Sequence, residues 1–197
     1  GCRMTLFFSL IGEFQIYNAL CAAGLLIGAG MDAARVLAAL PGLRPAPGRM
    51  ELVPDKHGAD KAVFVDYAHT PDALEKALTQ LRPYTTGSLQ LVFGCGGDRD
   101  TGKRPEMGKI AATYADTVTI TDDNPRTEDP AAIRQAIIHA CPQARAIGDR
   151  RKAITSAIEA MQPGDVLLIA GKGHEKTQKI GTQAMPFDDV AVAAEAL

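Results

Sequence analysis

The chain has 197 residues and a formal net charge of -2 at neutral pH, and hydrophobic residues make up 46% and charged residues 22% of it. These values are typical of a globular protein and exclude disorder, and neither nucleic acid binding nor a membrane span is expected from so small a charge and such short apolar runs. The cysteines Cys2, Cys21, Cys95 and Cys141 have no paired spacing, so we expect a reduced, cytoplasmic protein without a disulfide framework or a zinc site.

The first 46 residues predict a strand followed by two helices. Residues 3–11 read as a strand with nothing before it to pair with, so we expect the chain to begin inside a larger protein. Apolar residues at helical spacing predict a helix over 13–29, and Asp32 is placed to cap a second helix that stops at Pro41-Gly42. Residues 41–48 hold three prolines and two glycines, a composition typical of a linker between domains.

After the linker, strands alternate with helices. The apolar and β-branched runs predict five strands, at 62–65, 89–93, 117–121, 144–147 and 165–170. Capping residues predict helices that start at Thr70-Pro71, near Pro105, at Asp129-Pro130 and at Asp149. This order predicts an α/β, Rossmann-like fold, with a mostly parallel sheet and helices on both faces. Ligands of such sheets bind beyond the carboxyl ends of the strands, so we expect the polar loops there to gather at one edge.

One of these loops is the stretch Asp122-Asp123-Asn124-Pro125-Arg126. Proline restricts its own backbone and that of the residue before it, so we expect a stiff loop that holds Arg126 in place. A planar guanidinium on such a loop suits bidentate binding of a carboxylate or phosphate. An ion pair between Asp123 and Arg126 across the turn explains the same residues without any ligand.

The glycine-rich residues 94–97 precede a basic turn. Glycines let the backbone turn tightly or approach a ligand, and they leave amides free to bind an anion. Residues 97–104 resemble a Walker A loop, but Arg104 replaces the serine or threonine that binds magnesium, so we reject an ATP loop here. We predict instead that Arg99, Lys103 and Arg104 contact an anion, the alternative being a solvated basic turn.

The segment 171–175, Gly-Lys-Gly-His-Glu, again combines glycines with polar side chains. Glu175 offers a carboxylate to an ammonium group, although a tight turn with an exposed glutamate has the same pattern; we expect His174 to brace the loop. His69 either contacts phosphate or caps a helix, and Arg49 either faces a ligand at a hinge or lies in a solvated turn. Together these side chains fit a small zwitterion that carries both carboxylates and amines.

Six segments, in this order, resemble the Mur ligase family of peptidoglycan synthesis. They are GEFQIYNAL at 12–20, GRME at 48–51, DYAHTPD at 66–72, the stretch 93–108, DNPR at 123–126 and GKGHE at 171–175. The set spans nearly the whole chain and is far more specific than any single segment. The resemblance implies that residues 47–197 form the C-terminal, amino-acid-binding domain. It assigns residues 1–46 to the C-terminal end of the central ATP-binding domain, as a helical remnant.

The resemblance also implies an ATP-dependent amide ligase. In this reaction the D-glutamate carboxylate of UDP-N-acetylmuramoyl-L-alanyl-D-glutamate becomes an acyl phosphate, which an amine of meso-diaminopimelate attacks. Carried over by position, the diaminopimelate site comprises Arg99, Asp123, Asn124, Pro125, Arg126, Gly171 and Glu175. Arg126 matters most, since DNPR marks the diaminopimelate-adding members, in which arginine meets the distal carboxylate that lysine lacks. The nucleotide site comprises Asn18, Arg49, Asp66 and His69.

The chain departs from the family pattern in two respects. Gln15 stands where many relatives have asparagine, and the phosphate loop, the carbamylated lysine, the magnesium ligands and the UDP-binding domain have no counterpart in it. We therefore expect ATP and Mg²⁺ as cofactors with the metal ligands upstream, no catalytic residue in this fragment, and no activity of the fragment alone. The expected partners are small molecules, with no nucleic acid or membrane, and the expected state is a monomer. A lysine-adding ligase, which Arg126 disfavours, and a non-catalytic domain that binds an amino acid or a nucleotide remain alternatives.

Overall fold

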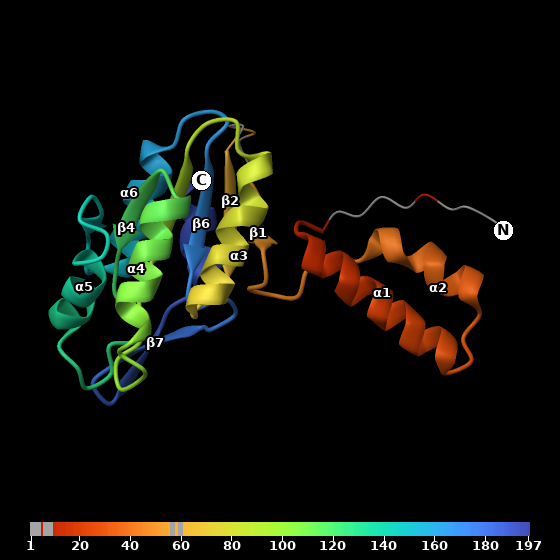
Figure 1. Cartoon of the computed structure of the whole chain (residues 1–197), viewed down its shortest axis with the longest axis horizontal. Helices are drawn as coiled ribbons and strands as arrows, with labels where there is room; N and C mark the ends of the chain where they lie inside the picture. Colours follow the sequence, from red (N-terminus) through yellow and green to blue (C-terminus); the bar gives the residue numbers. More distant parts are fainter. Residues whose placement is uncertain (1–4, 6–9, 56–57, 59–60) are drawn as a thin grey trace. The chain divides into compact units, whose positions relative to one another are not determined.

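The computed structural model describes residue 5 and residues 10–55, 58 and 61–197. The chain divides into two compact units, residues 1–46 and residues 47–197, which Figure 1 colours along the sequence. The strand predicted over 3–11 falls mostly on residues outside the described part. None of the described helices combines the length and the hydropathy that a membrane span requires.

The first unit is a pair of helices, α1 (Glu13–Gly28) and α2 (Ala33–Ala39), followed by the short 3-10 turn η1 (Leu40–Gly42). The Asp32 carboxylate accepts a hydrogen bond from the Arg35 amide at 2.9 Å, so the predicted cap of α2 is confirmed. The apolar cluster of this unit comprises Ala19 and Ala23 of α1, Val36 of α2 and Leu40 of η1. Most large apolar side chains of α1 are exposed, contrary to the apolar face that their spacing predicts; they are Phe14, Ile16, Tyr17, Leu20, Leu25, Leu26 and Ile27.

The second unit is built on a six-stranded sheet with the order β1-β2-β6-β3-β4-β5. Its strands are β1 (Glu51–Leu52), β2 (Ala62–Asp66), β3 (Leu89–Phe93), β4 (Thr117–Ile120), β5 (Arg145–Ala146) and β6 (Val166–Ala170). All neighbours are parallel except β1, which runs antiparallel to β2. In the centre, Leu167 of β6 pairs with Val63 on one side and with Gln90 on the other. The predicted parallel α/β fold is confirmed.

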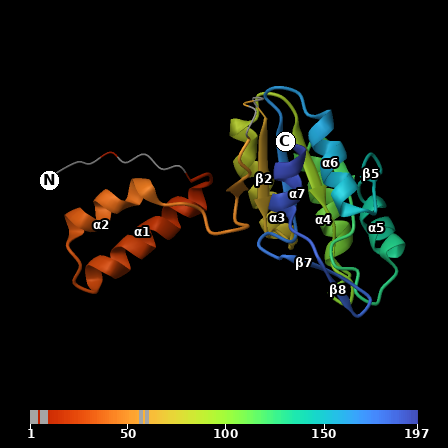
Figure 2. The ribbon, with the colours of Figure 1, turned by 180° about the vertical axis from the view of Figure 1, so that it is seen from behind.

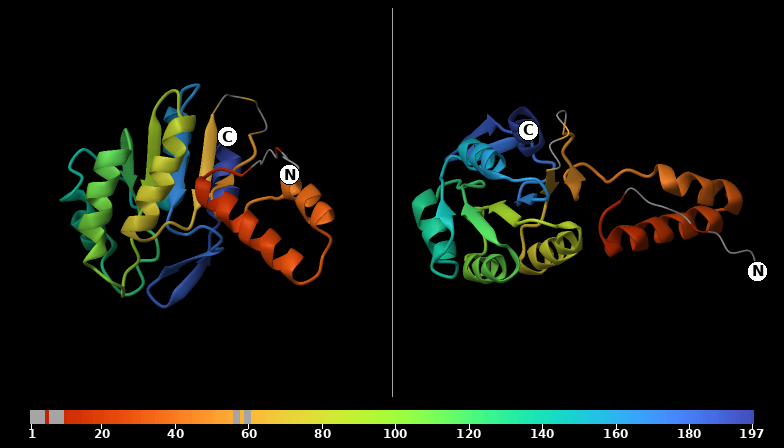
Figure 3. Two further views of the ribbon diagram at one scale, coloured as in Figure 1. Left: turned by 45° about the vertical axis from the view of Figure 1, so that its right-hand side comes forward. Right: turned by 90° about the horizontal axis from the view of Figure 1, so that it is seen from above.

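Helices cover both faces of this sheet, as the view from above in Figure 3 shows. The helices are α3 (Pro71–Leu81), followed by the 3-10 turn η2 (Arg82–Tyr84), α4 (Lys103–Tyr114), α5 (Pro130–Ile138), α6 (Arg150–Ala160) and α7 (Asp189–Ala196). Helices α3, α4 and α5 pack on one face of the sheet, and α6 and α7 pack on the other. Thr70, Asp129 and Asp149 accept hydrogen bonds from the first-turn amides, so these three predicted caps are confirmed.

The core fills the space between the sheet and each helix layer. On one face Leu74, Leu78 and Leu81 of α3 are completely buried. On the other face Ile154 and Ile158 of α6 pack with Val65, Leu167 and Ile169 of the sheet. This core holds the strand ends rigidly, which is what a site built on their loops requires.

Three elements of the second unit were not predicted from the sequence. They are the short edge strand β1, the helix α7, and a hairpin of β7 (Thr177–Ile180) and β8 (Gln183–Pro186). The hairpin forms a separate two-stranded sheet and is visible at the lower side of the domain in Figure 2. Its strands are too polar and too exposed to show the alternation by which a strand is recognised.

Candidate functional site

The carboxyl ends of β2, β6, β3 and β4 are neighbours in the sheet, and the loop after each carries predicted site residues. The Gly171 amide donates to the Asp66 carbonyl at 3.1 Å, which joins the loops after β6 and β2. The Asn124 side-chain amide donates to the Glu175 carboxylate at 2.8 Å, which joins the loops after β4 and β6. The prediction that these loops gather at one edge is confirmed.

The loop after β3 packs backbone against backbone on the loop after β4. A Cβ added to Gly94 would lie 2.1 Å from the Thr121 carbonyl oxygen, and one added to Gly97 would lie 2.0 Å from that of Pro125. Such contacts are too short for any other residue, so close approach of the two loops explains both glycines. The Gly97 amide donates to the Asn124 carbonyl at 2.9 Å. The prediction that the amides of this glycine-rich stretch are free to bind an anion is therefore wrong for Gly97.

Arg126 is held by its backbone on one side and by its guanidinium on the other. Its φ is 51°, in the left-handed region, and its amide and carbonyl are both bonded to the β7–β8 hairpin. Its Nη1 donates to the Gly97 carbonyl at 2.7 Å. Its Nε and Nη2 make no hydrogen bond to the described residues, which leaves two donors for a ligand. The alternative prediction, an ion pair between Asp123 and Arg126, is wrong, because none of the ion pairs among the described residues joins these two side chains.

Lys172 is completely buried and connects three segments of the site. Its Nζ donates to the Asn124 side-chain oxygen at 3.0 Å, to the Glu175 carboxylate at 3.1 Å and to the Thr177 carbonyl at 2.7 Å. All three of its protons therefore have partners. Burial alone would raise the pKa of Glu175, but the hydrogen bonds from Asn124 and Lys172 outweigh it and hold this pKa below its usual value.

Asp123 is the buried anion of the site, with 7% of its surface exposed. Burial raises the pKa of its carboxyl, against the opposing effect of the cations Arg150 and Lys172. Arg150 itself is fully buried and forms a bidentate pair with Asp189 of α7, at 2.8 and 2.7 Å. A Cβ on Gly171 would lie 2.7 Å from the Asp123 carboxylate, so this glycine, with φ of 111°, makes room for it.

The basic turn after β3 carries one exposed side chain, Arg99, and two side chains bonded to other parts of the domain, Lys103 and Arg104. Arg99 is exposed, and its Nη1 donates to the neighbouring Asp98 carbonyl at 3.0 Å. Arg104 is buried and pairs with Glu128 at 2.9 Å, so its prediction as an anion contact of a ligand is wrong. Lys103 donates to the His69 carbonyl at 2.7 Å, which ties this turn to the loop after β2.

Two of the predicted nucleotide residues lie where the segment after the linker meets the β2 loop. Asp66 is buried, and its carboxylate accepts from the amides of Met50 at 2.7 Å and Ala68 at 2.8 Å. Burial raises the pKa of Asp66, although these two bonds and Arg49 lower it in part. Arg49 is exposed and lies over the Tyr67 ring, 4.8 Å from its centroid. Asp66 therefore fixes the backbone that presents the guanidinium of Arg49.

The aromatic ring of Tyr67 joins the two histidines of this region. Its centroid lies 4.4 Å from that of His69 and 5.3 Å from that of His174. Gly48 packs closely there, since a Cβ on it would lie 2.1 Å from the His174 amide nitrogen. The His69 Nδ1 lies 2.8 Å from the Tyr67 carbonyl oxygen, and Thr70 is the residue that caps α3. The capping role considered for His69 is therefore wrong.

Asn18 belongs to the first unit, where it is exposed on α1. Asn18 therefore belongs to a different unit from Arg49, Asp66 and His69. Among the described residues, no group of three histidine, cysteine or acidic side chains is arranged to hold a metal ion.

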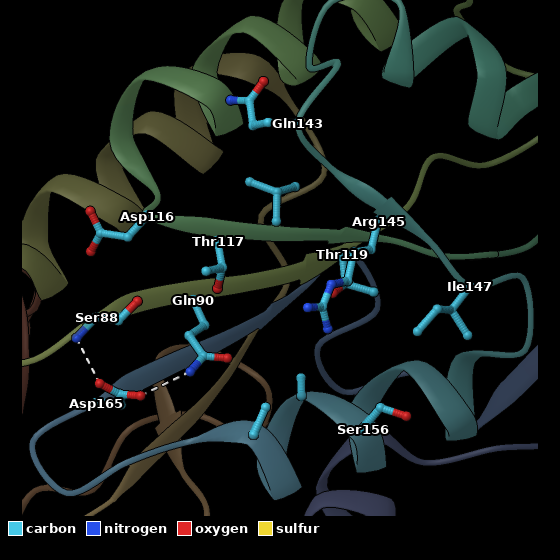
Figure 4. A pocket seen from close by; sticks show the side chains of 13 residues that line it. Ser88, Gln90, Asp116, Thr117, Thr119, Gln143, Arg145, Ile147, Ser156 and Asp165 are labelled. Carbon is cyan, nitrogen blue, oxygen red and sulfur yellow. Dashed lines mark hydrogen bonds between the residues drawn. The ribbon is translucent and has the colours of Figure 1, made fainter.

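A cavity of the second unit lies away from the four loops. Figure 4 shows it beside β4 and α6, with a volume of about 440 Å³. It is lined at the amino ends of the strands, where Asp165 accepts from the Ser88 amide at 2.7 Å and from the Gln90 side chain at 3.0 Å. Since ligands of parallel sheets bind at the carboxyl ends, this groove is not the predicted site.

Three residues of the site were missed from the sequence. Lys172 stands between two glycines that were singled out, and its burial had no local signal. Arg150 follows the predicted helix cap Asp149, in a position where a solvated arginine is the ordinary expectation. Gln178, whose Nε2 donates to the Asp123 carbonyl at 2.8 Å, lies on the hairpin that was not predicted.

The completed edge offers charges of both signs on rigid loops. Arg126 and Arg99 are cations with free donors, while Glu175 and Asp123 are carboxylates in the adjacent loops. Groups of opposite sign on neighbouring loops suit a ligand that carries both ammonium and carboxylate groups. Among the described residues, Asn124, Lys172 and Glu175 hold one another in place, and this arrangement suits the binding and orientation of such a ligand.

The chain was compared with known proteins. Residues 48–173 match the family described as "Mur ligase, glutamate ligase domain". The chain is 57% identical over its full length to the UDP-N-acetylmuramoyl-L-alanyl-D-glutamate--2,6-diaminopimelate ligase of Bradyrhizobium diazoefficiens, of which it covers 40%. It is 56% identical over 188 residues to the ligase of the same name from Caulobacter vibrioides, with 95% of the chain and 38% of that protein covered.

Solved structures give the same result. One bearing the same ligase name has a TM-score of 0.75 and 41% identity, over 98% of this chain and 40% of that one. The UDP-N-acetylmuramate-alanine ligase of Thermotoga maritima has a TM-score of 0.67 with 19% identity, over 98% of this chain and 39% of that one, and so shows the fold alone. The chain spans about two fifths of the length of the relatives it matches. Because the family match covers more than half of the residues, the chain belongs to the Mur ligase family.

Proposed function

We propose that this chain is the amino-acid-binding part of an ATP-dependent ligase. The ligase adds meso-diaminopimelate to UDP-N-acetylmuramoyl-L-alanyl-D-glutamate. The observation that carries the proposal is the free edge of the Arg126 guanidinium beside the Asn124, Lys172 and Glu175 network. The names of the relatives that are 52–57% identical support the choice of substrates. ATP supplies the phosphoryl group that activates the acceptor carboxylate.

The residues of this chain bind and orient the incoming amino acid. Arg126 binds the distal carboxylate through Nε and Nη2, with Nη1 anchored on Gly97. Glu175 stays ionised because its pKa lies below the usual value, so it can bind an ammonium group at neutral pH. Asp123 and Gly171 shape the floor beside it, and Arg99 supplies a second cation at the rim.

Arg49 and Asp66 form the part of the nucleotide site that the second unit holds. The Arg49 side chain is exposed and suits a phosphate, whereas Asp66 already accepts two backbone amides and acts chiefly by positioning residues 48–50. Asn18 and His69 stay candidates for the same nucleotide. The monomeric state and the cytoplasmic location likewise stay predictions.

Calorimetric titration of the chain with meso-diaminopimelate and with L-lysine tests the proposal. We expect diaminopimelate to bind and lysine to bind at least about tenfold more weakly, since lysine leaves the Arg126 donors without a partner. The variant Arg126→Ala is expected to lose diaminopimelate affinity by about ten- to a hundredfold and to leave lysine affinity unchanged. Arg151→Ala, which removes an exposed arginine paired with Glu195 on α6 and α7, is the matched control.

Two results would overturn the proposal. If lysine binds as tightly as diaminopimelate, the distal carboxylate is not recognised and the substrate is wrong. If neither amino acid binds, the edge is not a preformed amino-acid site in this chain.

A further inference from the structure

The β7–β8 hairpin contributes almost nothing to the core of the domain. All four residues of β8 are exposed, and β7 ends in two exposed residues. Ile180 and Met185 keep half of their surface in solvent. A segment that adds so little burial needs another reason for its position beside the strand ends.

The hairpin is instead bonded to the loop that carries Arg126. The Arg126 amide donates to the Lys179 carbonyl at 3.1 Å, and the Gly181 amide donates to the Arg126 carbonyl at 2.7 Å. These two bonds form a bridge between Arg126 and Ile180, parallel in sense. The Lys179 amide also donates to the Asn124 side-chain oxygen at 2.9 Å. The hairpin thus adds a strand-like partner to a loop that has no strand of its own.

Gln178 supplies the side-chain part of this attachment. Its Nε2 donates to the Asp123 carbonyl at 2.8 Å and to the Asp122 carbonyl at 3.2 Å. These two carbonyls stand just before Asn124 and Arg126, and Gln178 is half-buried against them. Both protons of one amide group therefore serve the loop on which the proposed selectivity depends.

We propose that Gln178 is a positioning residue that sets the selectivity of the amino-acid site through Arg126. The inference rests on the proposed function. Arg126 adopts a left-handed backbone that a residue with a side chain rarely takes, so its surroundings must hold it there. With Gln178 and the Arg126–Ile180 bridge in place, the guanidinium keeps one direction and its free edge stays fixed in the site. Without Gln178 the loop samples other conformations, and the carboxylate contact weakens while the remaining contacts persist.

The test is a double-mutant cycle read by calorimetry on the whole chain, with meso-diaminopimelate and L-lysine as ligands. Gln178→Ala is expected to lower diaminopimelate affinity about tenfold and to leave lysine affinity unchanged. In the Arg126→Ala background the same change is expected to have no further effect, since Gln178 acts only through Arg126. Gln183→Ala is the matched control, because this glutamine lies exposed on β8 of the same hairpin.

Gln178→Met keeps the size of the side chain without its donors and guards against a result due to lost volume. It is expected to behave as Gln178→Ala, with an unchanged circular dichroism spectrum. The inference is wrong if Gln178→Ala binds diaminopimelate as the wild type does, if it lowers the affinities for both ligands alike, or if its effect persists in the Arg126→Ala background. If the wild type itself binds L-lysine as tightly as meso-diaminopimelate, the proposed function is wrong, and the role of Gln178 is not what has failed.

Discussion

The site concentrates buried charge on a few residues. Lys172 and Arg150 are completely enclosed; all three Lys172 protons and the Nε and Nη2 of Arg150 are bonded to acceptors, while the Arg150 Nη1 has no partner among the described residues. Burying a cation is costly unless it is paired, so these contacts hold the loops after β4 and β6 in one arrangement. Asp123 is a buried carboxyl whose burial is not fully compensated, because the cations that oppose its raised pKa, Arg150 and Lys172, are already paired with Asp189 and Glu175. The geometry of the site therefore costs stability at this residue.

Asp123→Asn is expected to stabilise the folded chain at pH 7. Burial raises the folded pKa of Asp123 above its unfolded value of about 3.9. Below the unfolded pKa the carboxyl is protonated in both states and contributes no difference. As the pH rises above that value, the unfolded state loses its proton first, and the ionised side chain destabilises the fold. Urea unfolding at several pH values should show a gain from Asn at pH 7 that disappears near pH 4.

Asp98 supplies a control of opposite sign for this pH series. Hydrogen bonds from the Thr127 side chain and amide lower the pKa of Asp98 in the folded chain. The ionised carboxylate of Asp98 therefore stabilises the fold above its unfolded pKa, and this stabilisation is lost as the pH falls through the folded pKa. Asp98→Asn is therefore expected to destabilise at pH 7. A loss of stability in Asp123→Asn at pH 7 would contradict the view that its burial is uncompensated.

At the scale of elements, the arrangement depends on loops that touch each other directly. The strands β2 to β6 and the helices α3 to α6 could be predicted because apolar periodicity and caps such as Thr70 and Asp149 are local signals. The gathering of loops followed from the parallel topology. The hairpin, the burial of Lys172 and the role of Gln178 had no local signal, since each depends on a partner more than forty residues away or on an element without an apolar pattern.

Gly97→Ala tests the direct contact between the loops after β3 and β4. A Cβ there would lie 2.0 Å from the Pro125 carbonyl oxygen, so the two backbones must separate. We expect a loss of roughly 1–3 kcal/mol in the free energy of unfolding, measured with urea. Gly102→Ala is the control, because it lies in the same loop with φ of -62° and its Cβ would meet only the Asp100 side chain, at 3.2 Å. Equal stability of the two variants would mean that the loops move apart without cost.

At the scale of the whole molecule, the two units differ in how much they bury. The second unit has apolar side chains packed on both faces of a six-stranded sheet. Within the described residues of the first unit, the apolar cluster consists of Ala19, Ala23, Val36 and Leu40. Ordering each residue of a chain costs about 1–2 kcal/mol of conformational entropy, which small buried side chains offset poorly.

We therefore expect the first unit to open at a far lower free energy than the second. In native-state hydrogen exchange of the whole chain, amides of α1 and α2 should exchange at least about a hundredfold faster than those of α6, because the opening free energy of a local unit falls with its buried apolar area. The comparison with α6 is fair because it is also a surface helix, yet it buries Ala153, Ile154, Ala157 and Ile158 against the sheet.

Addition of meso-diaminopimelate should slow exchange in the loops after β4 and β6 and leave α1 unchanged, since the proposed amino-acid site lies wholly in the second unit. If the amides of α1 are protected from exchange as strongly as those of α6, the small apolar cluster of Ala19, Ala23, Val36 and Leu40 does not make the first unit less stable, and this prediction is wrong.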